Sequence, residues 1–439
     1  MKILLVGNGG REHSIALKIS ESESYINSRS TLYCTIGNPG IDKTAIPVDI
    51  KPTDIEGLLK FAKSESIDLA VVGPEIPLSL GITDIFTENG IKVFGPSKSA
   101  AEIETSKIFA KEFMMRRGIP TARFKSFSSA NQDESASFIK SLNFPVVIKA
   151  DGLAAGKGVC IAQNESEASE FILELTSQKI FGESGSSFII EEFLEGFEIS
   201  VFAVTDGEDY VILPAAQDHK RIGEGDTGKN TGGMGSYAPA DGLIDTDTKE
   251  KIKELIIEPA LRGLKEEGRK YIGCLYCGLM ISGDRNNRRP FVVEFNCRLG
   301  DPETQSVLPL IKSDFLELLI AASEGNIRNY KLETRRLFSG CVVAASGGYP
   351  DKYETGKVIS GLDSTADDVL VIHSGTKYSS DKKSILTSGG RVLSVVGFSP
   401  ESIESALKKA YEGLEKIGFE NMYFRKDIGY KFNKIKNDA

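Results

Sequence analysis

Residues 148–159 read Ile-Lys-Ala-Asp-Gly-Leu-Ala-Ala-Gly-Lys-Gly-Val, a glycine-rich stretch that contains two lysines. It resembles a Walker phosphate loop, but no Ser or Thr follows Lys157, and a strand pattern follows where that motif has a helix. The pattern instead predicts a glycine-rich flap between two antiparallel strands, whose backbone N–H groups can close over a triphosphate. Lys149 and Lys157 bracket this flap and add positive charge for phosphate groups. A flexible hairpin with solvated lysines is the alternative, and it leaves the two bracketing lysines unexplained.

A second decisive stretch, residues 292–303, reads Val-Val-Glu-Phe-Asn-Cys-Arg-Leu-Gly-Asp-Pro-Glu. Glu294 and Asn296 are two residues apart on a predicted strand, so their side chains project to the same face. Mg²⁺ takes a few protein oxygens and completes its octahedron with phosphates and water. Arg298 on that face is suited to bind a carboxylate or an acyl phosphate through two hydrogen bonds. The stretch therefore predicts a metal-dependent site for phosphoryl transfer.

Two polar segments lie between these stretches. Residues 189–198 (Ile-Ile-Glu-Glu-Phe-Leu-Glu-Gly-Phe-Glu) indicate a strand that enters a hinge, which fits an adenine-binding edge after a phosphate flap; solvated carboxylates are the alternative. Residues 217–221 (Gln-Asp-His-Lys-Arg) and 230–235 (Asn-Thr-Gly-Gly-Met-Gly) flank a polar loop. Because this loop lacks apolar residues, we expect it to lie outside the core, around a transferring phosphoryl group. We expect His219 to be an ordinary surface histidine with no role in proton transfer.

The first hundred residues alternate strand and helix patterns, which predicts an open parallel sheet with ligands beyond the carboxyl ends of its strands. Residues 7–13 (Gly-Asn-Gly-Gly-Arg-Glu-His) resemble a dinucleotide fingerprint. The resemblance fails because Glu12 occupies the third glycine position and the second strand ends in Gly-Asn-Pro-Gly at 37–40 instead of an acidic residue. Backbone N–H groups at a helix N-terminus still bind anions, so the loop favours a phosphomonoester over NAD. A plain tight turn is the alternative.

Length and composition narrow the class of protein. A chain of 439 residues is too long for one core, so two to four domains are expected. A net charge of −9 argues against a nucleic-acid partner. The sequence has no apolar run of the length of a signal-peptide core or a membrane span, so no membrane partner is expected. Cys274 and Cys277 lie in an apolar strand-like run, which favours buried thiols in a reducing cytoplasm over a zinc site.

Local patterns predict the remaining elements. The expected strands are 2–7, 31–36, 69–73, 92–95, 145–150, 158–162, 187–192, 274–281, 291–296, 340–345, 369–372 and 391–396. The expected helices are 106–117, 165–176 and one that carries Ile403, Leu407, Ala410, Leu414 and Ile417 on one face. We divide the chain into an N-terminal domain at 1–104, a central domain at 105–330 with a small flap subdomain at 123–192, and a C-terminal domain at 331–439.

The order of flap, acidic hinge and Glu-x-Asn strand resembles the ATP-grasp superfamily. Nearly the whole chain, from residues 7–13 to Phe-Arg-Lys-Asp-Ile-Gly at 424–429, resembles the glycinamide ribonucleotide synthetase (phosphoribosylamine–glycine ligase) family. The segments at 217–221 and 230–235 are specific to that family. The resemblance implies an α/β and α+β multidomain fold: an ATP-grasp core between an N-terminal open parallel α/β sheet domain and a C-terminal α+β domain. It also implies that ATP phosphorylates the carboxylate of glycine and that the amine of 5-phosphoribosylamine attacks the glycyl phosphate.

The resemblance carries roles over to matching positions. The residues implied to bind ATP are Lys107, Lys149, Gly156 and Lys157 at the phosphates, Glu191, Phe193 and Leu194 at adenine, and Glu198 at the ribose. Those implied to act on glycine and on the transferring charge are Asp218, Lys220 and Arg298. Those implied to bind 5-phosphoribosylamine are Gly9, Gly10, Arg11, Glu12, Asn38, Pro39, Gly40 and Glu75. Glu294 and Asn296 would bind Mg²⁺ or Mn²⁺.

One position departs from the wider superfamily. Many ATP-grasp enzymes carry another metal-binding Glu on the strand before Glu-x-Asn, whereas residues 275–281 offer none and Gly278 lies near the expected position.

Two other functions are weighed against the ligase. A carboxylase acting on an aminoimidazole ribotide is disfavoured by residues 217–221. A non-catalytic nucleotide sensor needs neither Arg298 nor Lys220. The expected partners are small molecules, and the expected form is a monomer or a weak homo-oligomer.

Overall fold

The N-terminal region folds as the predicted open parallel sheet. The structure is a computed structural model that describes residues 1–128, 131, 134–152, 158–177, 187–284, 287–364, 366 and 368–432. The sheet has the order β3-β2-β1-β4-β5, and its strands are β1 (Lys2–Val6), β2 (Thr31–Thr35), β3 (Ile46–Val48), β4 (Leu69–Val72) and β5 (Lys92–Phe94). The helices are α1 (Gly10–Ser20), α2 (Glu23–Asn27), α3 (Ile55–Glu65), α4 (Glu75–Ser79), α5 (Ile82–Glu88) and α6 (Lys98–Thr105), with a 3₁₀ turn η1 (Ile41–Lys43). Strand order reverses between β1 and β4, so the loops after these two strands lie at the switch point where α/β sheets bind ligands.

β3 is the strand of this sheet that the sequence patterns did not predict. It has three residues, carries Pro47 and lies at the sheet edge. A proline is tolerated there because an edge strand can leave one backbone position unpaired. Such a short strand gives no period-two pattern to detect.

The middle of the chain contains two antiparallel sheets. The flap sheet has the order β6-β9-β7-β8, with β6 (Phe124–Ser128), β7 (Val146–Ala150), β8 (Val159–Ala162) and β9 (Ser187–Glu192), next to α8 (Ser135–Ile139) and α9 (Glu165–Ser177). It has its own apolar core, in which Phe188 and Ile148 are fully buried. The central sheet has the order β11-β10-β16-β17, with β10 (Phe197–Thr205), β11 (Tyr210–Ile212), β16 (Gly273–Ser282) and β17 (Arg289–Asn296). Strand β16 is almost continuously apolar because protein covers both of its faces.

Helices and short turns complete this middle part. The helices are α7 (Lys107–Arg117), α10 (Thr246–Ile252), a π-helical segment η6 (Lys253–Ile257), α11 (Glu258–Glu266), α12 (Glu303–Val307) and α13 (Phe315–Glu324). The 3₁₀ turns are η4 (Glu224–Asp226), η5 (Asp241–Leu243), η7 (Leu308–Leu310) and η8 (Ile327–Asn329). Helix α7 begins after Ser106, whose side chain accepts the N–H of Phe109, and ends at Gly118 in a left-handed conformation.

The C-terminal sheet draws on two distant parts of the chain. Its main path is β12-β15-β18-β23-β20, with β12 (Gln217–Asp218), β15 (Gly235–Ala238), β18 (Phe338–Ser346), β20 (Val369–His373) and β23 (Arg391–Ser399), and β24 (Met422–Tyr423) pairs with β18. A hairpin of β13 (Arg221–Gly223) and β14 (Thr227–Asn230) projects between β12 and β15. A small sheet of β19 (Val358–Ile359), β22 (Ile385–Thr387) and β21 (Thr376–Tyr378), the turn η9 (Leu362–Ser364) and helix α14 (Ile403–Leu414) complete this part.

The loop at 222–229 lies outside the core as expected, but the expectation that His219 is a surface residue is wrong. Gln217 is 1% exposed and His219 is fully buried, so the segment belongs to the core and His219 is not a surface residue. The reason is that its polar groups are bonded within the protein. The Gln217 amide donates to the Glu198 carbonyl oxygen (2.6 Å) and accepts from the Tyr237 hydroxyl (2.6 Å). The absence of apolar residues therefore did not exclude burial.

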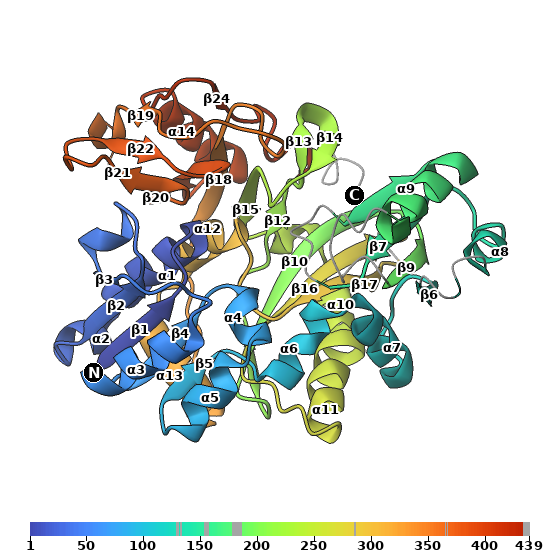
Figure 1. Ribbon diagram of the computed structural model, residues 1–439, viewed down its shortest axis with the longest axis horizontal. Coiled ribbons are helices and arrows are strands. Elements are labelled where there is room, and N and C mark those ends of the chain that lie inside the picture. The colour runs from blue at the N-terminus through green and yellow to red at the C-terminus, as the bar shows by residue number, and fades with distance from the viewer. Residues whose placement is uncertain are drawn as a thin grey trace.

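The N-terminal and C-terminal sheets lie on one side of the central sheet, and the flap sheet lies on the other (Figure 1). Gly278 of β16 is paired with Glu294 of β17 at the centre of this arrangement. The six cysteines are free thiols, and Cys274 and Cys277 are buried as expected. Among the described residues, no helix is long and apolar enough to cross a membrane.

Candidate active site

Glu294 and Asn296 lie at the end of β17, beside a bulge. Between Gly278 and Leu279 of β16 the register slips, so Val293 has no partner residue on β16. The carbonyl oxygen of Val293 accepts a hydrogen bond from Lys149 Nζ (3.2 Å), which brings the flap strand β7 to this point. A Cβ atom at Gly278 would lie 3.2 Å from Cγ of Glu294, so a larger residue there would crowd the carboxylate. The bulge and the glycine together make room around Glu294.

Cations surround the Glu294 carboxylate. Lys220 Nζ lies 3.0 Å from Glu198 and 3.6 Å from Glu294. The Glu294 side chain keeps 44% of its surface accessible to solvent. Burial acts to raise its pKa, but Lys220, Lys149 and Lys107 outweigh burial and lower the pKa to about 2. Glu294 is therefore an anion at neutral pH, as a cation ligand must be. We call Lys107, Lys149, Glu198, Lys220, Glu294, Asn296 and Arg298 the Glu294 centre.

Arg298 joins this centre to the N-terminal sheet. Its guanidinium donates to Oδ1 of Asn296 (3.2 Å) and forms ion pairs with Glu104 (3.2 Å) and Glu75 (3.4 Å). Glu75 begins α4 directly after β4, at the switch point of the N-terminal sheet. The sequence patterns did not identify Glu104, whose carboxylate also accepts the N–H of Cys297 (2.6 Å). Burial raises the pKa of Glu104, and its only sequence signal is its place just before the α7 cap.

Lys149 and Glu191 meet on neighbouring strands. Lys149 Nζ lies 3.1 Å from Glu191, and Lys111 lies 3.2 Å from the other oxygen of the same carboxylate. Burial lowers the pKa of Lys111 to about 8. No sequence pattern assigned Lys111 to the site, although it follows Lys107 by one helical turn and so shares its face. Phe193, expected at adenine, is 39% exposed just after β9.

The base of the flap is fastened to α7. Lys107 Nζ donates to the carbonyl oxygen of Gly152 (2.7 Å), and burial lowers the pKa of Lys107. The Asp151 carboxylate accepts the N–H of Ile108 and the hydroxyl of Ser106, each at 3.1 Å. Gly156 and Lys157, expected at the ATP phosphates, lie outside the described residues.

Asp218 lies on β12, close to a second buried carboxylate. Burial raises its pKa, and the charges of Glu303 and Glu198 act in the same direction. Glu303 accepts hydrogen bonds from the hydroxyls of Ser200 and Tyr276, each at 3.0 Å. Glu303 ends the stretch at 292–303, but the sequence offered no reason to assign it a role.

The residues expected at the sugar phosphate make most of their contacts within the protein. We call residues 7–13 and 37–40 the N-terminal loops. Arg11 is 7% exposed, and its guanidinium donates to Glu12 (2.6 Å) and to the carbonyl oxygen of Leu299 (3.3 Å). Glu12 also accepts the N–H of Gly9 (2.7 Å). These side chains shape the turn that places the N-terminus of α1, where backbone N–H groups can bind an anion.

Asn38 ties the second loop to the first. Its side chain accepts the N–H of Gly40 (2.9 Å) and donates to the carbonyl oxygens of Asn8 (2.9 Å) and His373 (3.2 Å). Pro39 and Gly40 are buried beside it. A Cβ atom at Gly40 would lie 2.2 Å from the His13 ring, so the residue that ends this motif must be glycine.

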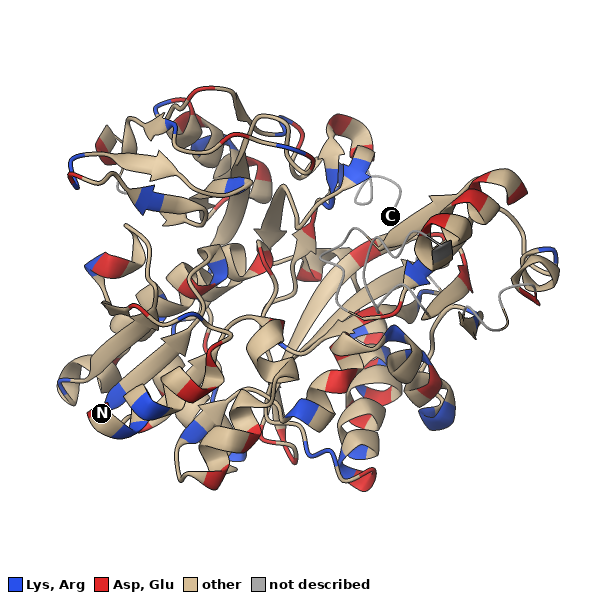
Figure 2. Cartoon of the chain, in the orientation of Figure 1, with Lys and Arg blue, Asp and Glu red and all other residues tan. Residues whose placement is uncertain are grey.

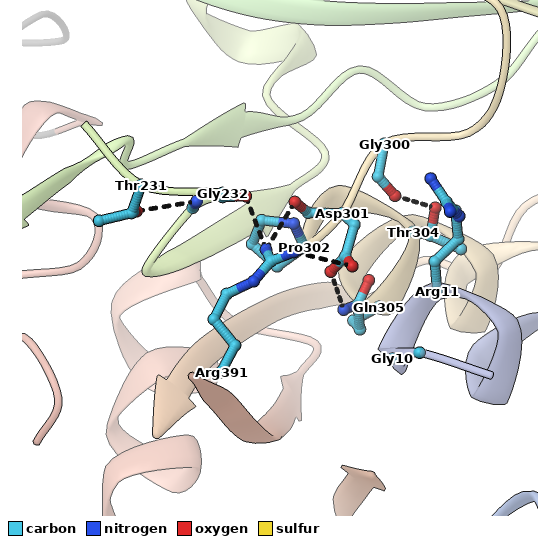
Figure 3. A network of polar contacts seen from close by, with 12 residues as sticks. Gly10, Arg11, Thr231, Gly232, Gly300, Asp301, Pro302, Thr304, Gln305 and Arg391 are labelled. Atoms are coloured by element: carbon cyan, nitrogen blue, oxygen red, sulfur yellow. Dashed lines mark hydrogen bonds and ion pairs between the residues drawn. The ribbon is translucent and has the colours of Figure 1, made fainter. Parts of the chain in front are cut away.

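Arg391 of the C-terminal sheet joins the loop at 230–235 to the turn after β17 (Figure 3). It donates to the carbonyl oxygens of Gly232 (2.6 Å) and Asp301 (2.9 Å) and to the Asp301 carboxylate (3.0 Å). Gln305 donates to the other oxygen of Asp301 (2.7 Å) and lies next to Gly10, where a Cβ atom would be 2.8 Å from its amide nitrogen. Three parts of the chain therefore converge beside the Glu294 centre.

The concentration of charge at this centre is local. Acidic and basic residues are interspersed over the outer helices of every part of the molecule (Figure 2). A separate cavity of about 520 Å³ lies beside β10 and β11. It is lined mainly by apolar residues, including Val201, Leu213 and Leu337. None of the residues expected at the active site lines it.

Family models match almost the whole chain. Those for the three parts of phosphoribosylglycinamide synthetase match residues 1–104 (N domain), 105–304 (ATP-grasp domain) and 339–431 (C domain). The phosphoribosylamine–glycine ligase of Chlorobaculum tepidum is 48% identical over 438 residues, 98% of this chain and 100% of that protein. That of Escherichia coli O157:H7 is 43% identical over 434 residues, 98% of each chain.

Solved structures that resemble this chain include a protein of the same family. The phosphoribosylamine–glycine ligase of Thermotoga maritima has a TM-score of 0.81 at 35% identity, covering 98% of this chain and 100% of that one. The biotin carboxylase of Campylobacter jejuni has a TM-score of 0.71 at 16% identity, covering 96% and 92%. The second likeness is one of fold alone.

Proposed function

The chain belongs to the phosphoribosylglycinamide synthetase family, and we propose that it joins glycine to 5-phosphoribosylamine with ATP as the energy source. The products are glycinamide ribonucleotide, ADP and phosphate, in the second step of purine biosynthesis. Relatives that carry the ligase name align over the full length of the chain, which supports the whole reaction and not only nucleotide binding.

The observation that carries the proposal is the position of Lys220. It lies between Glu198 and Glu294, on the 217–221 segment. A lysine beside the metal carboxylate can neutralise charge as a phosphoryl group moves from ATP to a carboxylate. Arg298, bonded to Asn296, adds a planar donor pair that suits the carboxylate of glycine.

The residues at the end of β17 fit a divalent cation. Glu294 is anionic and accessible to solvent, and Asn296 presents an amide oxygen two residues further on. Glu294 and Asn296 would hold Mg²⁺ or Mn²⁺, which needs few protein ligands and, when bound, would withdraw charge from a phosphoryl group. Among the described residues, no cluster of three acidic, His or Cys side chains offers a fuller site.

The proposed division of labour follows the three parts of the chain. Residues 105–330, with the flap subdomain at 123–192, bind ATP through Lys107, Lys149, Gly156, Lys157, Glu191, Phe193, Leu194 and Glu198. Residues 1–104 bind 5-phosphoribosylamine through the N-terminal loops and Glu75. Arg298 contacts Glu75, so the glycyl phosphate forms next to the place where the amine would enter. Asp218 orients glycine, and residues 331–439 close the site.

The acting form is proposed to be a cytoplasmic monomer or weak homo-oligomer. Six free thiols, five of them buried, fit a reducing compartment.

The test is an ADP-release assay with each substrate omitted in turn. Release that requires both glycine and freshly prepared 5-phosphoribosylamine is the expected result. ADP released with bicarbonate in place of glycine would instead indicate a carboxylase, and tight ATP binding without any ADP would indicate a nucleotide sensor.

A further inference from the structure

The position of Lys220 in the active site depends on a segment far away in the sequence. Residues 424–429 read Phe-Arg-Lys-Asp-Ile-Gly, and the proposed reaction gives this motif no role of its own. In the structure the motif packs against the β13–β14 hairpin, which continues directly from Lys220 (Figure 1). We call residues 423–431 the C-terminal clamp.

Arg425 is the centre of the clamp. Its side chain is fully buried, and it donates twice to Asp427 (2.8 Å each), once to Asp226 (2.8 Å) and once to the carbonyl oxygen of Arg221 (3.0 Å). Asp427 in turn accepts the N–H of Gly225 (2.8 Å). A buried guanidinium is costly without such partners, so this geometry is held by the whole network and not by one contact.

Both chain neighbours of Lys220 are bonded to the clamp. On one side, Nε2 of the buried His219 accepts the N–H of Gly429 (3.1 Å). On the other side, the carbonyl oxygen of Arg221 accepts from Arg425. The carbonyl oxygen of Lys220 itself accepts the N–H (2.8 Å) and the hydroxyl (2.9 Å) of Thr231. The backbone on either side of Lys220 is therefore fixed, which aims its ammonium group at Glu198 and Glu294.

His219 is suited to this task because it is neutral. Burial lowers its pKa to about 3, and the nearby charges of Lys431 and Arg425 act in the same direction, against those of Asp226 and Asp427. A neutral ring that accepts at Nε2 carries its proton on Nδ1. Within the part of the chain that the structure describes, Nδ1 has no hydrogen-bond partner, so the bond to Gly429 is what fixes the ring to the clamp.

We propose that the C-terminal clamp positions Lys220 for phosphoryl transfer, with Arg425 and His219 as positioning residues that touch no substrate. This inference rests on the proposed function of Lys220. It gives the C-terminal segment a specific part in the reaction, beyond covering the site. A small displacement of a reacting group is enough to slow a reaction by about 100-fold, so loss of the clamp should act mainly on turnover.

The first experiment compares His219→Phe with His219→Gln in the full chain. Phe keeps a ring of similar size and removes the acceptor, whereas Gln can place its amide oxygen near the position of Nε2. We expect His219→Phe to lower kcat by about 10- to 100-fold with less than about threefold change in KM for ATP. His219→Gln should recover most of kcat. Equal losses in both variants would overturn the role of the acceptor.

Arg425→Lys tests the other half of the clamp, with Lys426→Ala as the matched control. A lysine cannot reproduce the forked contacts with Asp226 and Asp427, so kcat should fall as in His219→Phe. Lys426 is exposed on the same segment, and its loss should leave kcat and stability unchanged. A variant that is less stable but has wild-type kcat per folded molecule would overturn the proposal.

Amide hydrogen exchange separates failure of the clamp from failure of the proposed function. Peptides that span residues 217–235 should exchange faster in His219→Phe and Arg425→Lys, while peptides from β16 should not change. Unchanged exchange at 217–235 would refute the clamp even if the assay gave no activity. If the wild type released no ADP in response to glycine, but the variants still exchanged faster at residues 217–235, only the proposed ligase function would be refuted.

Discussion

The Glu294 centre and the N-terminal loops contain similar residue types but use them differently. In the N-terminal loops, Arg11 and Glu12 are nearly buried and bond to each other and to backbone groups. In the Glu294 centre, several lysines gather around a carboxylate that keeps 44% of its surface accessible to solvent. The first arrangement uses its side chains to shape a turn and leaves the anion to backbone N–H groups. The second keeps side-chain charge available for a ligand.

Burial and bonding partners therefore distinguish side chains that can bind a ligand from side chains that only support the fold. Residue type alone does not make this distinction. When a charged side chain makes all of its bonds inside the protein, its removal mainly lowers the stability of the fold. When a charged side chain faces solvent among other charged groups, its removal mainly lowers the turnover rate. Four substitutions test this distinction.

Glu294→Gln should have the largest effect on activity. The substitution removes the negative charge that binds the cation and pairs with Lys220, so kcat should fall by about 1,000-fold or more. Thermal stability should change little because the side chain is partly accessible. Glu195→Gln, at an exposed position just before β10, is the control and should be active. Near-wild-type turnover in Glu294→Gln would show that the charge of Glu294 is not needed for the reaction.

Arg298→Lys should lower kcat by about 100-fold. One ammonium group cannot contact Asn296, Glu75 and Glu104 in the way the planar guanidinium does. Arg289→Lys on the same strand is exposed and should behave like the wild type. A loss confined to KM for ATP, with kcat unchanged, would mean that Arg298 serves nucleotide binding alone.

Arg11→Ala should act on stability as well as on substrate binding. It leaves Glu12 buried without its partner, at a cost of about 3 kcal/mol in the free energy of unfolding. The KM for 5-phosphoribosylamine should rise more than that for ATP, since the turn before α1 would lose its shape. Chemical denaturation and steady-state kinetics measure the two effects. An effect on ATP alone would mean that the two phosphate sites have been exchanged.

His13→Asn should have the smallest effect, visible as a change in pH dependence. Nδ1 of His13 accepts the N–H of His373 (2.8 Å), and an Asn side chain can keep that acceptor. Burial, helped by His373 and Lys43, lowers the pKa of His13 to about 3. The unfolded chain therefore binds a proton below about pH 6.5 that the folded chain does not, and stability is lost as pH falls.

The size of this effect follows from linkage. Between pH 7.5 and 5.5, the wild type should lose about 1.4 kcal/mol more stability than His13→Asn, because Asn does not titrate. Groups shared by both proteins, such as Asp218, cancel in the difference. Parallel stability curves for the two proteins would show that His13 is accessible to protons in the folded state.

Much of the fold could be predicted from the sequence because its signals are local. Alternation of strand and helix patterns predicts the parallel sheet, and an apolar run predicts the buried strand β16. The helix was predicted at 106–117 because Gly118 and Pro120 mark its end, and the structure has it at Lys107–Arg117. The short strands β3 and β12 carry no periodic signal and were missed, and the nine-residue strand β10 was missed as well.

The family and the residue types of the site follow from local sequence, because flap, hinge and Glu-x-Asn lie in recognisable contiguous stretches. The contacts of those residues depend on how distant parts of the chain pack together. Glu104 of α6 pairs with Arg298, Lys111 of α7 pairs with Glu191, and His219 is buried because the C-terminal segment packs over it. Ion pairs and burial depend on residues far apart in the chain, and no local pattern encodes that pairing. The flap and the Glu-x-Asn strand thus indicate phosphoryl transfer. The packing of the chain determines which charged side chains remain free to contact a ligand.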